Sequence, residues 1–382
     1  MAERTPPPHL STVTGRPALR RYSRHLLIPE VGVAGQAKLA RARVLVVGAG
    51  GLGSPVLQYL AAAGVGVLGI VDDDIVDVTN LQRQVIYGEA DLGLPKAVVA
   101  AARVHALNRE VGCEVFVQRF EAPGARELVR GYDVVADCTD TFGARYLIND
   151  ACRLEDKPDV YASIFRFEGQ ISVFRADGPC YRCLFPEPPP EGSVPSCAEG
   201  GVLGVLAGMV GTWQANEVLK LVLGIGKPLV GRLALLDALE GRAREIAFAS
   251  DPACPLHGPA ATIAEPLEAA RVAREPLGVP ELAPAELDEY LAAHPDARVL
   301  DVREPHEAIL EAPPQSVALP ASTLEARLHE LDSAREYIVA CRVGVKSRWA
   351  AGRLRDAGFR RLQHLSGGLL GYAATHPDFD FF

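Results

Sequence analysis

Four residues of the sequence have the types and the spacing of a closed zinc site. Cys180 and Cys183 form a Cys-x2-Cys pair, and Cys254 and His257 form a Cys-x2-His pair later in the chain. Three thiolates and one imidazole complete the tetrahedron that structural zinc prefers, and four protein ligands leave no open position for a substrate. The sequence therefore predicts a structural Zn²⁺ site, with a vestigial cluster that binds no metal as the alternative.

Cys341 begins a different kind of site. A predicted strand over residues 337–341 runs into the loop Cys341-Arg-Val-Gly-Val-Lys-Ser347, and a helix begins near its end. Backbone N–H groups over a helix N-terminus, together with Arg342 and Lys346, would stabilise a thiolate or a persulfide anion. We interpret Cys341 as a reactive cysteine; the alternative is a core cysteine at the end of a strand.

A glycine-rich turn predicts phosphate binding. Gly48, Gly50, Gly51 and Gly53 belong to a G-x-G-x-x-G motif between a predicted strand, 43–48, and a predicted helix, 54–63. Glycines let the backbone approach a phosphate, and the helix N-terminus supplies amide donors. Asp72 ends the next predicted strand, 66–72, where a carboxylate can bond a ribose hydroxyl. An NAD-dependent dehydrogenase fits this much equally well.

The chain after Asp72 favours a nucleoside triphosphate over a dinucleotide. Cations there would neutralise phosphate charge, and a carboxylate just past the predicted strand 132–138 can hold Mg²⁺. The alternative is that Arg83 and Lys96 are ordinary solvated charges on the surface. The residues concerned are Asp74, Asn80, Leu81, Gln82, Arg83, Lys96 and Asp140.

The elements that must position these residues indicate an α/β fold. Short β-branched runs alternate with helical stretches, which is the rhythm of a Rossmann-like, doubly wound sheet. We expect a loose tail over 1–19, this domain over 20–258, an Ala/Pro/Glu-rich linker over 259–280 and a smaller α/β domain over 281–382. In the smaller domain a further strand is predicted at 298–302.

Composition bounds the function. The 382 residues carry a formal net charge of −9, which argues against general nucleic-acid binding. The N-terminus lacks the apolar region of a secretory signal, and no run reaches the roughly 20 apolar residues of a membrane span. We expect a soluble, cytoplasmic protein with no membrane partner, whose eight cysteines are reduced.

Six motifs follow one another along residues 21–258: Arg21-Tyr-Ser-Arg-His25, Gly48–Gly53, Asn80-Leu-Gln-Arg-Gln84, Asp137-Cys-Thr-Asp140, Phe167-Glu-Gly-Gln170 and Pro179-Cys-Tyr-Arg-Cys183. With these motifs in this order, the segment resembles the MoeB/ThiF family, relatives of the ubiquitin-activating enzymes. The resemblance implies MgATP-dependent adenylation of the C-terminal Gly-Gly carboxylate of a ubiquitin-like sulfur carrier by a homodimer.

The resemblance also implies residue roles. The motif glycines would cradle phosphate and Asp72 would hold the ribose, while Asn80, Arg83 and Lys96 would bind the triphosphate. Asp140 would place Mg²⁺, and Arg24 would reach the ATP of the partner subunit. The cysteine that matches Cys197 attacks the activated carrier or resolves a disulfide intermediate. Two positions depart from the family: Thr141, where Asn is common, and His257, where a cysteine is usual.

Residues 281–382 resemble a rhodanese domain. The matching features are Leu300-Asp-Val-Arg-Glu-Pro305, Cys341–Ser347, and Leu365-Ser-Gly-Gly-Leu369 with Tyr372 nearby. The resemblance implies that Cys341 carries sulfur as a persulfide and that Asp301 and Arg303 brace its loop. The usual Gly-His-Ile-Pro-Gly-Ala stretch is absent from residues 308–320.

Together the two resemblances imply two consecutive reactions, adenylation of a carrier and then sulfur transfer to it. The sulfur donor is thiosulfate or the persulfide of a cysteine desulfurase. Alternatives are a dehydrogenase, an activating enzyme that uses a Cys197 thioester for isopeptide conjugation, and a non-enzymatic scaffold with a degenerate rhodanese module. We interpret His25 and three cysteines, Cys113, Cys138 and Cys152, as packing residues. We interpret His294 and His364 as surface residues.

Overall fold

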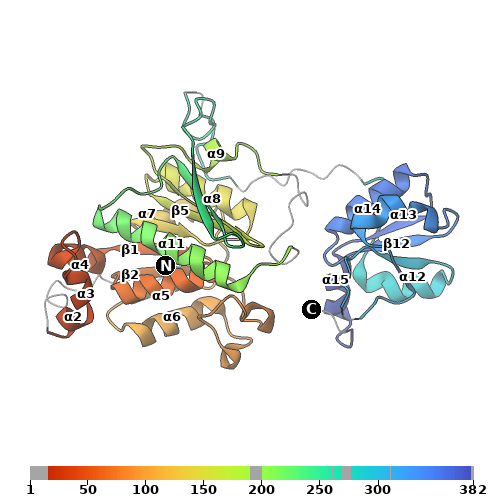
Figure 1. Ribbon diagram of the computed structural model, residues 1–382, viewed down its shortest axis with the longest axis horizontal. Coiled ribbons are helices and arrows are strands. Elements are labelled where there is room, and N and C mark those ends of the chain that lie inside the picture. Colours follow the sequence, from red (N-terminus) through yellow and green to blue (C-terminus); the bar gives the residue numbers. More distant parts are fainter. Residues whose placement is uncertain (1–15, 190–199, 260, 268–276, 310, 380–382) are drawn as a thin grey trace. The chain divides into compact units, whose positions relative to one another are not determined.

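The computed structural model describes residues 16–189, 200–259, 261–267, 277–309 and 311–379. The chain divides into two compact units, and the division in the C-terminal half falls between residues 270 and 271 (Figure 1). Each unit contains its own sheet. None of the helices in the described ranges combines the length and the apolar character that crossing a bilayer requires.

The larger unit is built on an eight-stranded sheet of order β3-β2-β1-β4-β5-β6-β7-β8. The first five strands of this order are parallel, and the last three pairings are antiparallel. The strands are β1 (Arg43–Val47), β2 (Val67–Val71), β3 (Gly112–Phe116), β4 (Val134–Asp137), β5 (Asp159–Phe165), β6 (Glu168–Phe174), β7 (Arg232–Asp237) and β8 (Arg242–Ala247).

Helices cover both faces of this sheet (Figure 1). Residues of α5, α6 and α11 pack into one hydrophobic cluster, and residues of α7 and α8 pack into a second one with the other side chains of β1 and β4. This explains why β1 and β2 are almost entirely apolar. The helices are α2 (Arg16–Arg21), α3 (Ser23–Leu26), α4 (Gly32–Arg41), α5 (Gly53–Ala63), α6 (Lys96–Leu107), α7 (Ala125–Arg130), α8 (Phe142–Leu154), α9 (Tyr181–Leu184) and α11 (Gly204–Leu223).

The smaller unit is a parallel five-stranded sheet of order β11-β10-β12-β13-β9. Two hydrophobic clusters fill it, one with α14 and the other with α12 and α15. Its strands are β9 (Glu281–Leu282), β10 (Arg298–Asp301), β11 (Ser316–Ala318), β12 (Tyr337–Ala340) and β13 (Leu362–Leu365). Its helices are α12 (Leu287–Ala293), α13 (Leu324–Arg327), α14 (Val345–Asp356) and α15 (Gly368–Thr375).

The doubly wound sheet predicted from the sequence is confirmed, with small differences at element ends. The predicted strand 132–138 is shorter, because only Val134–Asp137 pair with neighbouring strands. The tail expected over 1–19 is wrong for its last four residues, which belong to helix α2. Cys197 lies outside the described residues.

Candidate functional site

The glycine motif forms a tight turn between β1 and α5. Gly48 has φ +92°, and a Cβ there would lie 2.8 Å from the carbonyl oxygen of Cys138. A Cβ at Gly53 would overlap the carbonyl oxygen of Gly48. The motif therefore needs glycine at both ends, and the loop after β4 lies directly against it. This is the crevice at the carboxyl ends of adjacent strands where doubly wound sheets bind nucleotides.

Asp72 ties the end of β2 to this turn. Its carboxylate accepts hydrogen bonds from the N–H groups of Ala49 (2.7 Å) and Asp74 (2.9 Å). Burial raises the pKa of Asp72, and the two backbone hydrogen bonds and the charge of Lys96 oppose that rise. Each carboxylate oxygen keeps a second lone pair, so the group can still accept from the hydroxyls of a ribose.

Lys96 is not a solvated surface charge. Its side chain is 5% exposed at the start of α6, and its Nζ donates to Asp74 Oδ2 at 2.9 Å. Asp74 is 69% exposed, so the pair opens to solvent on the acidic side. The ammonium pairs with an exposed carboxylate and its charge also acts on Asp72, so a phosphate that enters from solvent can replace Asp74 as its hydrogen-bond acceptor.

Arg83 follows the short helix Val78–Asn80 and packs along the glycine turn. A Cβ at Gly51 would lie 3.7 Å from Arg83 Cγ and 3.3 Å from the Cβ of Ala207 in α11. The guanidinium donates to the carbonyl of Thr79 at 2.9 Å. Asn80 and Leu81 are half-buried in the same segment and Gln82 is exposed. Of the predicted phosphate-binding residues, Arg83 thus packs directly beside Gly51 of the glycine turn.

Asp140 is exposed in the loop between β4 and α8. Asp140 follows Cys138 closely in the chain, and a Cβ at Gly48 would lie 2.8 Å from the carbonyl oxygen of Cys138, so the loop that carries Asp140 adjoins the glycine turn. Thr141 caps α8, and its Oγ1 accepts a hydrogen bond from the N–H of Ala144 at 3.4 Å. An exposed carboxylate at this crevice has the oxygen donors that Mg²⁺ takes together with phosphate and water.

Sequence reasoning missed the buried groups beneath this loop. Gln214 of α11 donates from Nε2 to the carbonyls of Asp137 and Val160, both at 2.7 Å. Thr139 donates to Asp137 Oδ1 through its N–H (2.9 Å) and its hydroxyl (2.6 Å). These bonds shape the turn that carries Asp140. Gln214 lies among other polar residues of its helix, Thr212, Asn216 and Glu217, so no signal in the sequence singled it out.

The four predicted zinc ligands converge. Cys180 Sγ lies 3.8 Å from Cys183 Sγ and 3.7 Å from Cys254 Sγ, and Cys183 Sγ lies 3.1 Å from His257 Nε2. All four donor atoms lie within 4.8 Å of one another. Sulfur atoms in a tetrahedral zinc site with Zn–S bonds of about 2.3 Å lie about 3.8 Å apart. The donor set and the spacing fit Zn²⁺.

Burial controls the protonation of this cluster. Burial and a nearby Arg153 lower the pKa of His257, which favours the neutral imidazole that binds metal. Burial and the two neighbouring thiols raise the pKa of Cys180 far above its usual range. Without a cation the Cys180 thiol stays protonated, so a bound metal would displace its proton.

Helix α8 holds the Cys-x2-Cys segment in place. Asn149 Oδ1 accepts the N–H of Tyr181 at 2.8 Å, and Arg182 donates to both carboxylate oxygens of Asp150 at 2.7 and 2.8 Å. The same helix begins at Thr141, beside Asp140. A single rigid element therefore connects the nucleotide crevice to the metal cluster.

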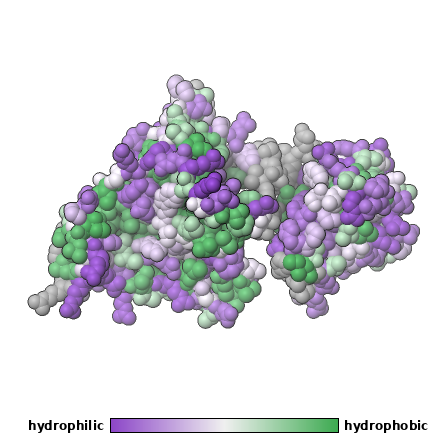
Figure 2. Space-filling view, viewed as in Figure 1, coloured by the Kyte–Doolittle hydropathy of each residue, from purple (hydrophilic) through white to green (hydrophobic). Residues whose placement is uncertain are grey.

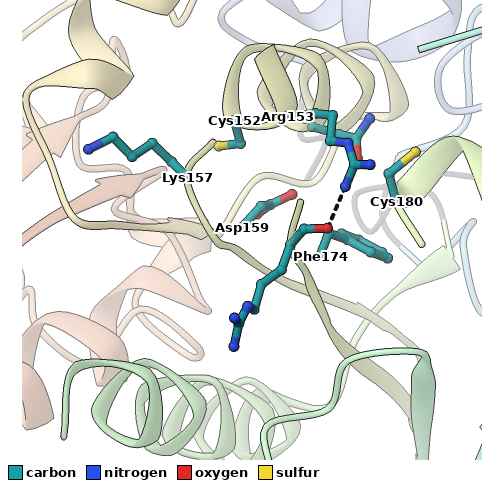
Figure 3. Close-up of a pocket in the computed structure, with 8 residues that line it drawn as sticks. Cys152, Arg153, Lys157, Asp159, Phe174 and Cys180 are labelled. Carbon is teal, nitrogen blue, oxygen red and sulfur yellow. Dashed lines mark hydrogen bonds between the residues drawn. The ribbon is translucent and has the colours of Figure 1, made fainter. Parts of the chain in front are cut away.

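A small cavity lies beside Cys180. Figure 3 shows Cys152 and Asp159 at its wall, with Arg153 donating to the backbone carbonyl of Arg175 at 2.5 Å. Its volume of about 10 Å³ suits a single water molecule. Burial, reinforced by the charge of Asp137, raises the pKa of Asp159 well above its usual value. The cavity is too small for a nucleotide.

Cys341 lies in a cradle of backbone amides. Its side chain is 2% exposed, and its Sγ accepts hydrogen bonds from the N–H groups of Gly344 (3.2 Å) and Ser347 (3.3 Å). Ser347 Oγ lies 3.3 Å from the same sulfur. Donors that converge from a helix N-terminus stabilise an anionic sulfur. The predicted loop geometry is present.

Hydrogen bonds hold the end of β10, and others tie the start of α15 to this loop. Arg303 donates to both carboxylate oxygens of Asp301 at 2.7–3.0 Å, a buried bidentate pair at the end of β10. The N–H groups of Leu369 and Leu370 donate to the carbonyls of Cys341 (2.9 Å) and Arg342 (2.8 Å). The start of α15 thus closes over the loop.

The second loop cation is paired. Lys346 Nζ lies 2.6 Å from Glu307 Oε2, which also accepts the N–H of Glu304 at 2.8 Å. Burial alone would raise the pKa of Glu307, but these hydrogen bonds and the Lys346 charge outweigh it and lower the pKa. Lys346 therefore does not bring an uncompensated positive charge to Cys341.

The remaining sequence-predicted residues take varied positions. Arg24 is exposed on α3. Cys138 and Cys152 are buried in the core and Cys113 is half-buried. The interpretation of His364 as a surface residue is wrong, because its side chain is 2% exposed within β13. His294 is half-buried against Tyr290, with ring centroids 4.2 Å apart, and His25 bonds Gln36 at 3.1 Å.

An exposed apolar patch borders the segment that contains Gln82 and Arg83. We call it the α11 patch. Backbone hydrogen bonds join its parts, from Leu203 to Arg166 (3.0 Å) and from Ala238 to Phe167 (2.9 Å). Figure 2 shows hydrophobic residues on the side of the larger unit that carries α11. The patch consists of Phe167, Leu203, Val205, Met209 and Leu239, each at least 40% exposed.

Two family models match this chain. The ThiF family model matches residues 22–256, and the Rhodanese-like domain model matches residues 283–375. These ranges contain the glycine turn and the Cys341 loop, respectively.

Individual proteins are similar over the same regions. The probable adenylyltransferase/sulfurtransferase MoeZ of Mycobacterium tuberculosis is 42% identical over 96% of this chain and 96% of its own. The sulfur carrier protein adenylyltransferase of Thermus thermophilus is 53% identical over 63% of this chain and 91% of its own. The structure of E. coli MccB with ATP superposes with a TM-score of 0.55 at 21% identity, covering 62% of this chain and 74% of that one, which shows a common fold.

Proposed function

The chain belongs to the ThiF family and carries a rhodanese-like domain after it, and on that premise we propose that it converts the C-terminal carboxylate of a ubiquitin-like sulfur carrier into a thiocarboxylate. It is an adenylyltransferase and sulfurtransferase, like the full-length relative described above. The observation that carries the proposal is the amide cradle around Cys341, on the same chain as a nucleotide crevice.

The first step is adenylation. A carboxylate oxygen of the terminal glycine attacks the α-phosphorus of ATP, the bond to the β-phosphate oxygen breaks, and pyrophosphate leaves. The glycine turn holds the phosphates, Asp72 accepts from the ribose, and Arg83 and Lys96 offset the charge that builds on the phosphate oxygens. Mg²⁺ held by Asp140 would add positive charge there. Lys96 would exchange Asp74 for phosphate.

The second step moves sulfur. A persulfide on Cys341, loaded from thiosulfate or from the persulfide of a desulfurase, attacks the acyl carbon with its terminal sulfur, and AMP leaves. The product is an acyl disulfide between carrier and Cys341. Attack by the Cys197 thiolate on the Cys341 sulfur releases the thiocarboxylate and leaves a Cys341–Cys197 disulfide, which a cellular dithiol reduces. The persulfide gains from the same amide donors as the thiolate.

The carrier docks on the α11 patch in this proposal. The patch is apolar and exposed, and it adjoins the segment that binds ATP: a Cβ at Gly204 would overlap the carbonyl oxygen of Gln82. A globular carrier would cover the patch while its tail reaches the α-phosphate.

We further propose a homodimer in which Arg24 reaches the ATP of the partner subunit. Exposed apolar residues follow Arg24 in the chain: Leu27 is 73% exposed, Ile28 is 45% exposed and Val33 is 51% exposed. A second copy would cover them. The zinc site is structural in this proposal, since its four protein ligands leave no position for a substrate. Thiol chemistry of this kind needs a reducing compartment, and we propose the cytoplasm.

One experiment tests the whole proposal. The protein is incubated with MgATP, thiosulfate and a small carrier that ends in Gly-Gly, and the intact mass of the carrier is recorded. We expect conversion of carboxylate to thiocarboxylate that requires ATP and Cys341. Pyrophosphate release with an unchanged carrier would contradict the sulfur step. Carrier–protein conjugates in place of thiocarboxylate would favour the isopeptide alternative.

A further inference from the structure

His364 occupies an unexpected position for a titratable side chain. It lies in β13, between β12 and β9 in the sheet, and is 2% exposed. Its Nε2 lies 2.9 Å from the carbonyl oxygen of Gly344. Because a carbonyl only accepts, Nε2 carries the proton of this hydrogen bond. The imidazole is therefore a fixed donor to the Cys341 loop.

The carbonyl that His364 holds belongs to the N-cap residue of α14. The same oxygen accepts the first hydrogen bond of the helix, from the N–H of Arg348 at 3.1 Å. Gly344 has φ +94°, in the left-handed region that glycine adopts without strain. Both amide donors to Cys341 Sγ, at Gly344 and Ser347, start from this cap.

Charged groups face the other ring nitrogen. Glu281 Oε1 of β9 lies 3.8 Å from His364 Nδ1, and the same oxygen pairs with Arg348 Nη1 of α14 at 3.0 Å. The ring thus stands between the cap of α14 and an ion pair that joins α14 to β9. Rotation of the imidazole away from Gly344 would disturb both contacts.

We propose that His364 is a positioning residue for sulfur transfer: by holding the carbonyl of Gly344, it keeps the N–H groups of Gly344 and Ser347 aimed at the sulfur of Cys341. It touches neither the donor nor the carrier. Its contribution is to the reactivity of the anionic sulfur, which the two amides stabilise. This inference rests on the proposed role of Cys341, but its test reads the free thiol and does not require a carrier.

The matched variants are His364→Met and His364→Gln in the full-length protein. The two side chains have the same length and nearly the same volume, but only glutamine keeps an N–H donor near the position of Nε2. The readout is the rate at which iodoacetamide alkylates Cys341 between pH 5 and 9, followed by the mass of the peptide that contains it. Alkylation of the half-buried Cys113 in the same samples reports on general loosening.

We expect His364→Met to slow alkylation of Cys341 at neutral pH about tenfold, because the amide donors no longer aim at the sulfur, and His364→Gln to restore most of the rate. With thiosulfate as donor and cyanide as acceptor, kcat should fall in the methionine variant while KM stays constant. Equal rates in His364→Met and the unaltered protein would overturn the proposal. So would equal losses in both variants together with faster labelling of Cys113, because that result indicates packing alone.

If His364→Met does not fold, His364→Asn replaces it in the comparison with glutamine. Asparagine carries the same amide one methylene short of Gly344, so we expect slow alkylation of Cys341 in His364→Asn. An asparagine variant as fast as the glutamine variant would contradict the proposal.

Discussion

The nucleotide crevice and the Cys341 loop differ in which molecule supplies the reacting atoms of the proposed reactions. In the crevice the reacting atoms belong to the substrates, and the fold contributes space and paired charges: glycines at both ends of the turn and a Lys96–Asp74 pair whose acidic partner is 69% exposed. At the Cys341 loop the reacting atom belongs to the protein. Two backbone amides already point at a sulfur that is 2% exposed.

This difference indicates where each half is vulnerable. A loop that holds its own reactive atom depends on backbone geometry, which distant supports such as Gly368 maintain; a Cβ there would lie 2.5 Å from the carbonyl of Cys341. The activity of the nucleotide crevice depends instead on individual side chains that contact the bound ligand. Mutations should therefore separate the two activities cleanly.

The largest expected effect tests this separation directly. Cys341→Ala should abolish thiocarboxylate formation, because no other described cysteine lies in an amide cradle of this kind. ATP-dependent pyrophosphate release in the presence of the carrier should stay within about twofold, since Cys341 takes no part in phosphoryl chemistry. Intact-mass measurement and a pyrophosphate assay on one preparation check both. Thiocarboxylate from the alanine variant would break the comparison.

Asp140→Ala should have the opposite signature. Loss of a group that stabilises charge on the transferred phosphoryl costs on the order of 10² to 10³ in rate. We expect carrier-dependent pyrophosphate release to fall by that amount, while thiosulfate-to-cyanide transfer by Cys341 is unchanged. Asp177→Ala is the matched control, because Asp177 is an exposed carboxylate that pairs with Arg175. Equal activity in the two aspartate variants would remove Asp140 from the proposed mechanism.

The metal cluster sharpens the comparison, because we expect it to support the fold without serving either reaction. His257→Ala should lower the zinc content of the protein. It should also lower the free energy of unfolding by about 2 kcal/mol or more, since the binding energy of a structural metal contributes to folding. Metal analysis and a thermal melt with and without a chelator check this. Cys113→Ser, a half-buried cysteine outside the cluster, should keep its zinc. A melting temperature that a chelator does not change in the unaltered protein would contradict a structural zinc.

Sequence reasoning worked best where chemistry fixes residue types. Cys180, Cys183, Cys254 and His257 were predicted from spacing alone, and their donor atoms converge within 4.8 Å. The Cys341 loop was also predicted from local sequence, because the cysteine ends a short apolar run and a predicted helix begins near Ser347. The strand order of the first sheet followed the expected doubly wound pattern.

Residues that act through the backbone were harder to find. His364 was interpreted as a surface residue. It lies two positions after the buried Leu362, however, and residues two apart in a strand share a face, so this spacing would have predicted that His364 is buried. The Lys346–Glu307 pair joins residues 39 positions apart, which no local pattern predicts. Gln214 and its two carbonyl partners likewise depend on how α11 crosses β4 and β5.

The smallest expected effect concerns the choice of sulfur donor. Glu307 offsets the charge of Lys346 beside the Cys341 loop, at 2.6 Å. Glu307→Gln keeps the shape and releases that charge, so a small dianionic donor should bind better. We expect KM for thiosulfate to fall about threefold, the effect of roughly 0.6 kcal/mol at a partly exposed pair, with kcat constant.

The pH dependence of this effect follows from the sign of the shift. The pKa of Glu307 lies below its usual value, so the carboxylate stays ionised above that range and takes up a proton only as the pH falls through the lowered pKa. The ratio of KM between the unaltered protein and Glu307→Gln should therefore be constant from pH 6 to 8. Glu330→Gln, in a surface pair with Arg327, is the matched control and should leave KM unchanged. A KM ratio near one would mean that Lys346 does not meet the donor, and the amide cradle alone would then account for sulfur binding at Cys341.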